Sequence, residues 1–161
     1  MRRWLVGGAV IEGPEGILLV QNQRRGGRID WSPPGGVIDD GEDVLTGLSR
    51  EVREETGLIV TRWEGPIYTI EATAPDLGWD LRVEAYWAVD VSGELVLEDP
   101  DGIVVDAAYL SHVACCDRLR DSHPWVAEPL TEYLDARWSG TRTFGYHVRG
   151  TEPAELVVTR L

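Results

Sequence analysis

Hydrophobic and polar positions along the chain follow two different periods. Short runs rich in Val, Ile, Leu and aromatic residues, each bounded by turn sequences, indicate β-strands. The first two runs, residues 3–12 and 16–23, flank the turn sequence GPEG and predict a β-hairpin. Later strands are predicted at residues 58–63, 67–73, 82–91, 104–110, 143–148 and 155–160.

A period near 3.6 replaces this pattern in three segments. Residues 43–56 carry good helix formers and an acidic first turn, and Gly57 follows where a helix C-terminus favours glycine. Helices are also predicted at residues 111–119 and 124–138, with a break or a second start at Pro129. Strands before, between and after the helices predict an α/β (α+β) fold.

The first predicted helix places carboxylates beside its apolar stripe. On a helical wheel that starts at Val44, Leu48 lies at about 40°. Glu51 and Glu55 lie within about 20° of Val44, and Glu54 lies at about −80°. Carboxylates gathered and desolvated in this way repel one another unless something neutralises them.

A hard divalent cation, Mg²⁺ or Mn²⁺, would neutralise these acids because it binds oxygen ligands. The preceding sequence PPGG, residues 33–36, lets a backbone pass close to the helix, where a glycine carbonyl is a further oxygen ligand. The alternative is an ordinary acidic helix face in contact with water.

Composition narrows the classes of function. The chain has 161 residues, which predicts one domain over residues 1–161. Its 28 acidic and 15 basic residues give a net charge of −13, and every basic residue is arginine. This balance argues against stable nucleic-acid binding, although bound cations would still allow a small polyphosphate substrate. The absence of lysine excludes a P-loop lysine and a Schiff-base lysine.

The sequence also bears on location and redox state. No apolar run reaches the length of a membrane span, so we expect a cytoplasmic protein without membrane contact. The two cysteines, Cys115 and Cys116, are adjacent and are expected to be reduced. The Trp-rich regions outside the first helix are compatible with a homodimer interface, but no spacing requires one.

One spacing carries more information than any of these patterns. Gly36 is followed after five residues by Glu42 and, after seven more, by the sequence REVREETGL at residues 50–58. This arrangement resembles an unbroken Nudix box. The resemblance implies an α/β/α sandwich around a mixed sheet. It also implies Mg²⁺-dependent hydrolysis of a pyrophosphate bond in a nucleoside diphosphate linked to another group.

The same resemblance implies roles for individual residues. Glu51, Glu54 and Glu55 resemble the metal-binding carboxylates of the family, and Glu51 and Glu54 are expected to be catalytic. Gly35 resembles the glycine whose carbonyl ligates the metal. The remaining box residues are expected to be structural, with an ion pair between the glutamate and the arginine: Gly36, Glu42, Arg50 and Gly57.

In many members of this family the general base comes from a downstream loop. Here the loop after the predicted strand at 82–91 is strongly acidic, with Glu94, Glu98, Asp99 and Asp101. We favour Glu98 as the base, with a loop acid that only contacts water as the alternative.

Substrate specificity lies outside the box. Arg24, Arg25 and Arg28, in a loop predicted at residues 24–30, are candidates to bind phosphate, and Trp31 is a candidate to stack on a base. Pro75 lies close to the position of the proline typical of the ADP-ribose subgroup but does not match it. ADP-ribose or a similar nucleotide-sugar is the favoured substrate. The alternatives are a MutT-like (d)NTP pyrophosphohydrolase, a catalytically silent nucleotide-binding regulator, and a metal-stabilised structural domain.

Overall fold

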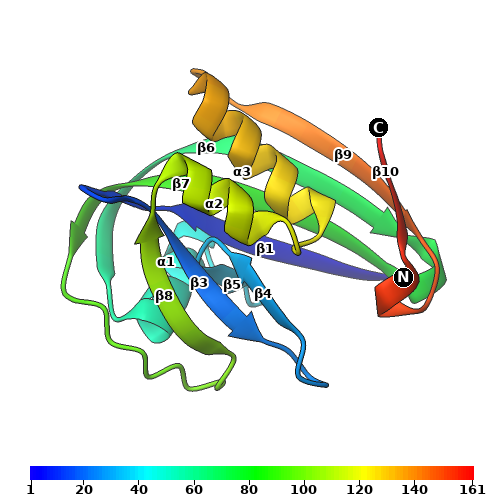
Figure 1. The fold of residues 1–161 in the computed structure, drawn as a ribbon, viewed down its shortest axis with the longest axis horizontal. Coiled ribbons are helices and arrows are strands. Elements are labelled where there is room, and N and C mark those ends of the chain that lie inside the picture. The colour runs from blue at the N-terminus through cyan, green and yellow to red at the C-terminus, as the bar shows by residue number, and fades with distance from the viewer.

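The structure is a computed structural model that describes all 161 residues. It contains two β-sheets and three α-helices, with one helix on one side of the sheets and two helices on the other side (Figure 1). The mixed α/β class predicted from the sequence is therefore confirmed. No helix has the length and apolar character that crossing a membrane requires.

The larger sheet has six strands and mixes parallel with antiparallel pairs. The β1–β7 and β6–β9 pairs are parallel, and the other three neighbouring pairs are antiparallel. In spatial order the strands are β10 (Val157–Arg160), β9 (Arg142–Arg149), β6 (Ile59–Ala74), β7 (Trp79–Ser92), β1 (Arg2–Val10) and β5 (Gly35–Val37).

The smaller sheet is antiparallel and is built around one central strand, β3. The strands are β2 (Glu12–Gly13), β3 (Gly16–Gln23), β4 (Ile29–Ser32) and β8 (Val104–Leu110). β3 pairs with β8 along most of its length, with β4 over its second half and with β2 at its start. The chain therefore passes from one sheet to the other within its first 20 residues.

Three helices complete the fold. α1 (Val44–Thr56) begins after Asp43, whose side chain accepts a hydrogen bond from the Thr46 amide, and it ends at Gly57 with φ of 79°. α2 (His112–Leu119) and α3 (Pro124–Ala136) lie against each other. Short 3₁₀ turns follow β6 at Pro75–Leu77 and precede β10 at Pro153–Glu155.

Two buried clusters stabilise this arrangement. The larger lies between the six-stranded sheet and α2 and α3, and includes Tyr68, Leu130 and Tyr146. The smaller lies beneath α1, where Leu48 and Val52 are fully buried. Burial of such side chains is the main favourable contribution to folding. The apolar stripe predicted for the first helix is thus confirmed.

Three details of the predicted topology are wrong. The expected hairpin exists only at its turn, because Glu12 and Gly13 pair with β3, whereas β1 pairs with β5 and β7 in the other sheet. Residues 24–30 are not entirely loop, since β4 starts at Ile29. Pro129 does not break α3 but lies buried within it.

The two runs at 58–63 and 67–73 form one strand, β6, whose pairing with β7 shifts register between Val60 and Tyr68. The sequence suggests two strands because Gly65 and Pro66, which are unfavourable inside a strand, lie between the two runs. The other predicted strands, including the terminal pair, are present with ends shifted by a few residues.

Candidate active site

A cavity of about 440 Å³ lies beside the box helix. Both sheets contribute to its walls, including β5 of the larger one, together with α1, the start of α3 and the loop that precedes β8. It therefore joins the box residues to parts of the chain far away in sequence. Glu51 and Glu55 face it from α1, and Gly35 and Gly36 face it from β5.

The two glycines of β5 allow this close approach, each for a different reason. Gly35 has φ of 153°, and a Cβ there would lie 2.0 Å from the Gly7 carbonyl oxygen. A Cβ on Gly36 would lie 2.7 Å from the carboxylate of Glu51. The first glycine lets β5 pair with β1, and the second leaves room for a carboxylate beside the strand.

Glu55 is the most deeply buried acid of the box, with 9% of its surface exposed. Burial raises the pKa of its carboxyl to about 8, while the hydrogen bond from the Gly35 amide to Oε1 at 2.8 Å opposes that rise. Burial also raises the pKa of Glu51, and the nearby Arg50 charge opposes this shift. These are desolvated, mutually repelling acids, as the helical wheel predicts.

Arg50 holds the outer side of the same cluster. Its guanidinium donates to both oxygens of Glu42, with Nε–Oε2 and Nη2–Oε1 distances of 3.0 Å. Its Nη1 also reaches Glu51 at 3.2 Å and Glu54 at 3.3 Å. The structure thus contains the Glu42–Arg50 ion pair that the box resemblance implies, and Arg50 connects that pair to two of the expected metal ligands.

The residues around the cavity suit a hard divalent cation in their chemistry. Glu51 and Glu55 bring two desolvated carboxylates to one wall, and Asp101 adds a third acid from the loop. Two observations qualify the ligand set that the resemblance implies. Glu54 pairs with Arg50 and does not line the cavity, and no three acids, histidines or cysteines already form a metal-binding group.

The acidic loop does not place its members equally. Glu98 is exposed and does not line the cavity. Asp99 lines it, but its oxygens accept hydrogen bonds from the backbone amides of Asp101, Ile103 and Val104, so it shapes the loop. Asp101 lines the cavity without such bonds, and its charge contributes to the raised pKa of Glu51. Asp101 is therefore the loop acid closest in placement to the expected base.

The three arginines predicted to bind phosphate differ in their position relative to the cavity. Arg24 lines the cavity and forms a two-bond pair with the buried Asp30, with Nε–Oδ2 and Nη2–Oδ1 distances of 2.9 and 3.0 Å. Arg28 binds the same carboxylate at 3.2 Å but does not line the cavity. Arg25 is exposed and lies outside it.

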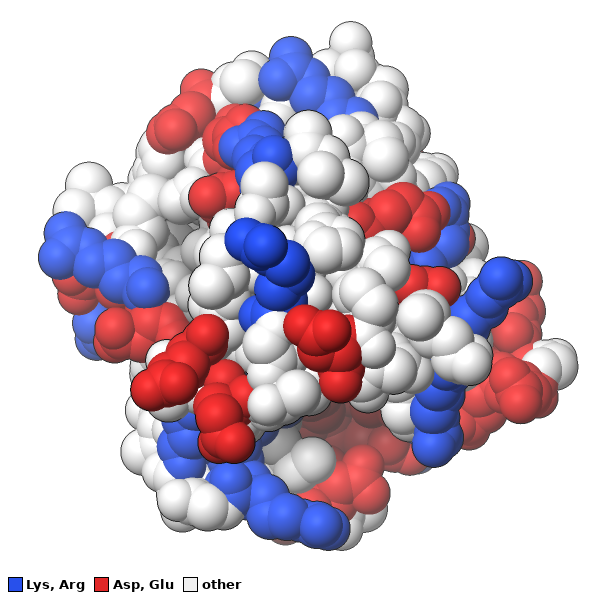
Figure 2. Space-filling model, turned by 90° about the vertical axis from the view of Figure 1, so that its right-hand side faces the viewer, with Lys and Arg blue, Asp and Glu red and all other residues white.

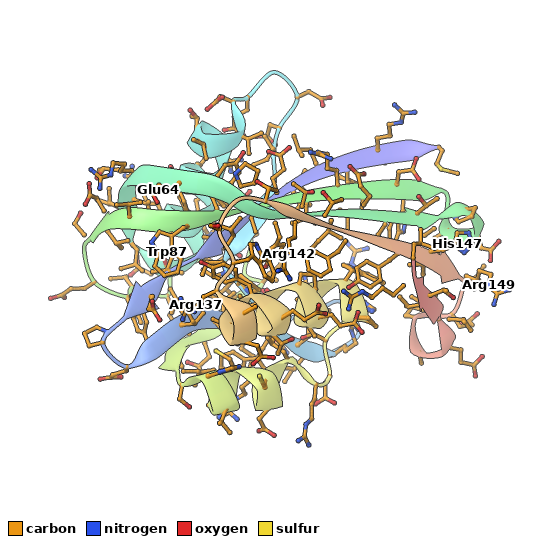
Figure 3. All side chains as sticks on the ribbon, turned by 90° about the horizontal axis from the view of Figure 1, so that it is seen from above. Glu64, Trp87, Arg137, Arg142, His147 and Arg149 are labelled. Carbon is orange, nitrogen blue, oxygen red and sulfur yellow. The ribbon has the colours of Figure 1, made fainter.

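The structure provides a different tryptophan from the one predicted. Trp31 packs against the larger core cluster, and its carbonyl accepts a hydrogen bond from Ser122. Trp87 lies beside Arg137 on another part of the surface (Figure 3). Trp125, at the start of α3, is the indole that lines the cavity, and it stacks on His123 with ring centroids 4.2 Å apart.

Sequence reasoning missed two further lining residues, Asn22 and Tyr68. Both lie in strands whose apolar neighbours suggest a purely structural role, and both are 3% exposed. A polar residue inside an apolar strand was the only available signal.

Comparison with known proteins identifies the family. The model of the NUDIX domain matches residues 1–133. The chain belongs to the Nudix family. The Nudix fold inferred from the box is thereby confirmed, and with it membership of a family whose enzymes hydrolyse phosphoanhydride bonds. Nudix enzymes act on small nucleotide substrates and typically depend on divalent metal ions.

Individual relatives match over shorter stretches or at lower identity. The 8-oxo-dGDP phosphatase NUDT18 of Danio rerio is 30% identical over 101 residues, which cover 52% of this chain and 31% of that protein. This chain spans about a sixth to a third of the length of the curated relatives it matches.

Two solved structures show the same fold at low identity. The Escherichia coli ORF135 protein has a TM-score of 0.70 at 22% identity, covering 86% of this chain and 96% of its own. The MutT Nudix hydrolase of Burkholderia pseudomallei has a TM-score of 0.67 at 23% identity, covering 82% and 98%.

Proposed function

We propose that this Nudix enzyme hydrolyses a phosphoanhydride bond of a single nucleoside di- or triphosphate, as a MutT-like pyrophosphohydrolase. The observation that carries this proposal is the cavity itself. It brings Glu51 and Glu55 together with Arg24 and Trp125 in one space of about 440 Å³. That volume lies toward the lower end of the range of roughly 300–1,000 Å³ for small-molecule sites, which favours one nucleotide.

The names of similar proteins support the same substrate class. The Danio rerio relative is named as an 8-oxo-dGDP phosphatase, and the Burkholderia pseudomallei structure is named as a MutT hydrolase. Neither name refers to ADP-ribose, and the single proline marker that favoured ADP-ribose in the sequence gains no support from them. We therefore favour a (d)NTP or (d)NDP as the substrate, with a nucleotide-sugar as the alternative.

Glu51 and Glu55 would hold the divalent cation, with Glu54 and the Gly35 carbonyl as the further ligands that the box resemblance implies. When bound, such a cation supplies positive charge for the phosphate oxygens and acidifies water. Glu55 is fixed for this task by the Gly35 amide, and Arg50 orients Glu51. Fixed partners of this kind keep ligating carboxylates in place before the substrate arrives.

Two other groups contribute to the reaction through their positions. Asp101 would accept the proton of the attacking water, since it faces the cavity with a free carboxylate. The indole of Trp125 would cover the base or sugar and exclude water from the reacting phosphates.

A screen of phosphate and pyrophosphate release tests the proposal. Purified protein with Mg²⁺ or Mn²⁺ would be offered (d)NTPs, (d)NDPs, nucleotide-sugars and dinucleoside polyphosphates. We expect the highest kcat/KM for a (d)NTP or (d)NDP, and almost none in excess EDTA or in Glu55→Gln. A clear preference for ADP-ribose would support the nucleotide-sugar hypothesis instead. Nucleotide binding without hydrolysis under all conditions would favour the silent regulator.

A further inference from the structure

Two buried polar atoms in the cavity have no partner in the protein. Tyr68 and Asn22 are each 3% exposed and line the cavity. No hydrogen bond reaches the Tyr68 hydroxyl or Asn22 Oδ1, whereas every side-chain nitrogen or oxygen sealed from solvent has a partner. Both atoms therefore open into the cavity. Buried groups of this kind select ligands that complete their hydrogen bonds.

The orientation of the Asn22 amide is fixed by its neighbours. Its Nδ2 donates to Asp30 Oδ1 at 3.1 Å and to Ser32 Oγ at 2.9 Å. A carboxylate beside two arginines accepts hydrogen bonds and does not donate them, so the nitrogen faces Asp30 and the oxygen faces the cavity. Asn22 thus presents a hydrogen-bond acceptor to a ligand.

Arg24 shares the Asp30 carboxylate with Asn22 and keeps a free donor of its own. Its Nη2 binds Asp30 Oδ1 at 3.0 Å, the same oxygen that holds Asn22. Its Nε is occupied by Asp30 Oδ2 at 2.9 Å, while Nη1 makes no hydrogen bond within the protein. One buried carboxylate therefore holds both side chains at the cavity wall, Arg24 with a free donor and Asn22 with a free acceptor.

We propose that Asn22 and Arg24 together read the base of the substrate and favour bases with a lactam edge, O=C–N–H. Arg24 would donate to the carbonyl oxygen, and Asn22 Oδ1 would accept from the adjacent N–H. This inference rests on the proposed function, because it assumes a nucleotide in this cavity. It assigns a substrate class, namely nucleotides of guanine, hypoxanthine, uracil or thymine, including oxidised bases that carry the same edge.

The chemistry of the pair favours a base over a phosphate at this position. A phosphate oxygen would be attracted by Arg24 but repelled by the adjacent Asn22 oxygen, which has no proton to offer. Adenine and cytosine offer an amine and a ring nitrogen, and arginine binds the carbonyl of an oxo base more readily. Trp125, with 7% of its surface exposed, adds an aromatic wall to the same cavity.

Size-matched nucleotide pairs test the proposal. With saturating Mg²⁺, kcat/KM would be measured for dITP against dATP and for dUTP against dCTP, because each pair differs mainly in the lactam edge. We expect the wild type to favour dITP and dUTP by about tenfold or more. Equal kcat/KM within each pair would overturn base reading.

Variants show whether the pair carries this preference. Asn22→Ala and the half-exposed Arg24→Gln should each reduce both ratios toward one. Tyr146→Phe is the matched control, since it removes a buried hydroxyl from the same core cluster outside the cavity. It should keep the ratios. A uniform fall for all four nucleotides in Arg24→Gln, with ratios intact, would show that Arg24 binds phosphate and would overturn the proposal.

The failure of this inference is separable from failure of the proposed function. If no nucleotide is hydrolysed, the proposed function fails, and calorimetric binding of dITP against dATP still measures base preference. If all four are hydrolysed equally, the function stands and the base reading fails. Thermal melting of Asn22→Ala identifies a variant that does not fold, in which case the wild-type ratios and Arg24→Gln decide.

Discussion

The Gly35 backbone amide donates a hydrogen bond of 2.8 Å to Glu55 Oε1, 20 residues further along the chain. This bond joins β5 to the last turn of α1, and it occupies one oxygen of the most buried acid in the cavity. The other oxygen is left for a ligand. Gly35 and Gly36 therefore determine how closely β5 approaches the carboxylates of Glu51 and Glu55.

The two glycines should respond differently to alanine. In Gly35→Ala the new Cβ meets the Gly7 carbonyl oxygen at 2.0 Å in a backbone conformation that favours glycine. We expect a loss of at least about 3 kcal/mol in the free energy of unfolding. Chemical denaturation of the purified variant measures it, and an unchanged midpoint would contradict the geometry described for β5.

Gly36→Ala should instead affect activity more than stability. Its Cβ meets the Glu51 carboxylate at 2.7 Å, the flexible end of a side chain that can move aside. We expect about a 100-fold loss of kcat with a stability change near 1 kcal/mol, since a displaced carboxylate is costly to catalysis. Gly145→Ala is the control, because a Cβ at this strand position makes only ordinary contacts of 3.4 Å or more and the residue lies outside the cavity.

The box and the features outside it differ in how far the sequence could predict them. Local patterns predict α1, the glycine at its C-terminus and the burial of Glu55, because helical period and spacing act within a few turns. The predicted acidic first turn is wrong, since Asp43 precedes the helix as its N-cap. The crossing of the chain after β1 depends on pairing between distant strands, which period alone does not encode. The result was a predicted hairpin where two sheets exist.

Dependence on distant contacts also explains why the predicted site residues Trp31 and Glu98 do not line the cavity. Trp31 precedes the double glycine in sequence, yet its side chain packs into the core, while Trp125 reaches the cavity from α3. Glu98 was favoured among four loop acids that the sequence alone could not rank, and the fold turns Asp101 toward the cavity instead. Side-chain direction in loops depends on tertiary contacts that no single segment contains.

Arg50 should couple stability to activity because it pairs with four carboxylates, those of Asp39, Glu42, Glu51 and Glu54. Replacing it with Gln removes the two-bond pair with Glu42 and the contacts with Glu51 and Glu54. We expect a lower melting temperature and about a 10- to 100-fold loss of kcat/KM as the ligating acids lose their orientation. Arg62→Gln, which breaks an exposed pair with Asp90, should leave both measurements unchanged.

Two loop variants distinguish the candidates for the general base. Asp101→Asn should lower kcat by about 100-fold or more, because a carboxamide cannot accept the proton of water. Glu98→Gln should keep kcat within about twofold, since Glu98 does not line the cavity. A reversed outcome would return the role to Glu98. Equal, small effects would assign the proton transfer to Glu51 of the box.

The raised pKa of Glu55 predicts how the metal-free protein responds to pH. Its folded pKa of about 8 lies above the ordinary value of 4.5, so the folded state binds the proton more tightly than the unfolded state. The stabilisation is present at low pH and is lost as pH rises through the folded pKa. In EDTA, the free energy of unfolding should fall by a few kcal/mol between about pH 5 and pH 9.

Glu55→Gln provides the matched control for this pH dependence. Glutamine keeps an oxygen for the Gly35 amide but carries no charge, so the stability of the variant should change much less over the same interval. Mg²⁺ should flatten the wild-type curve above about pH 7, because a bound cation stabilises the ionised carboxylate. If the stability of Glu55→Gln falls as steeply with pH as that of the wild type, another group titrates. The pH dependence would then no longer support Glu55 as a metal ligand.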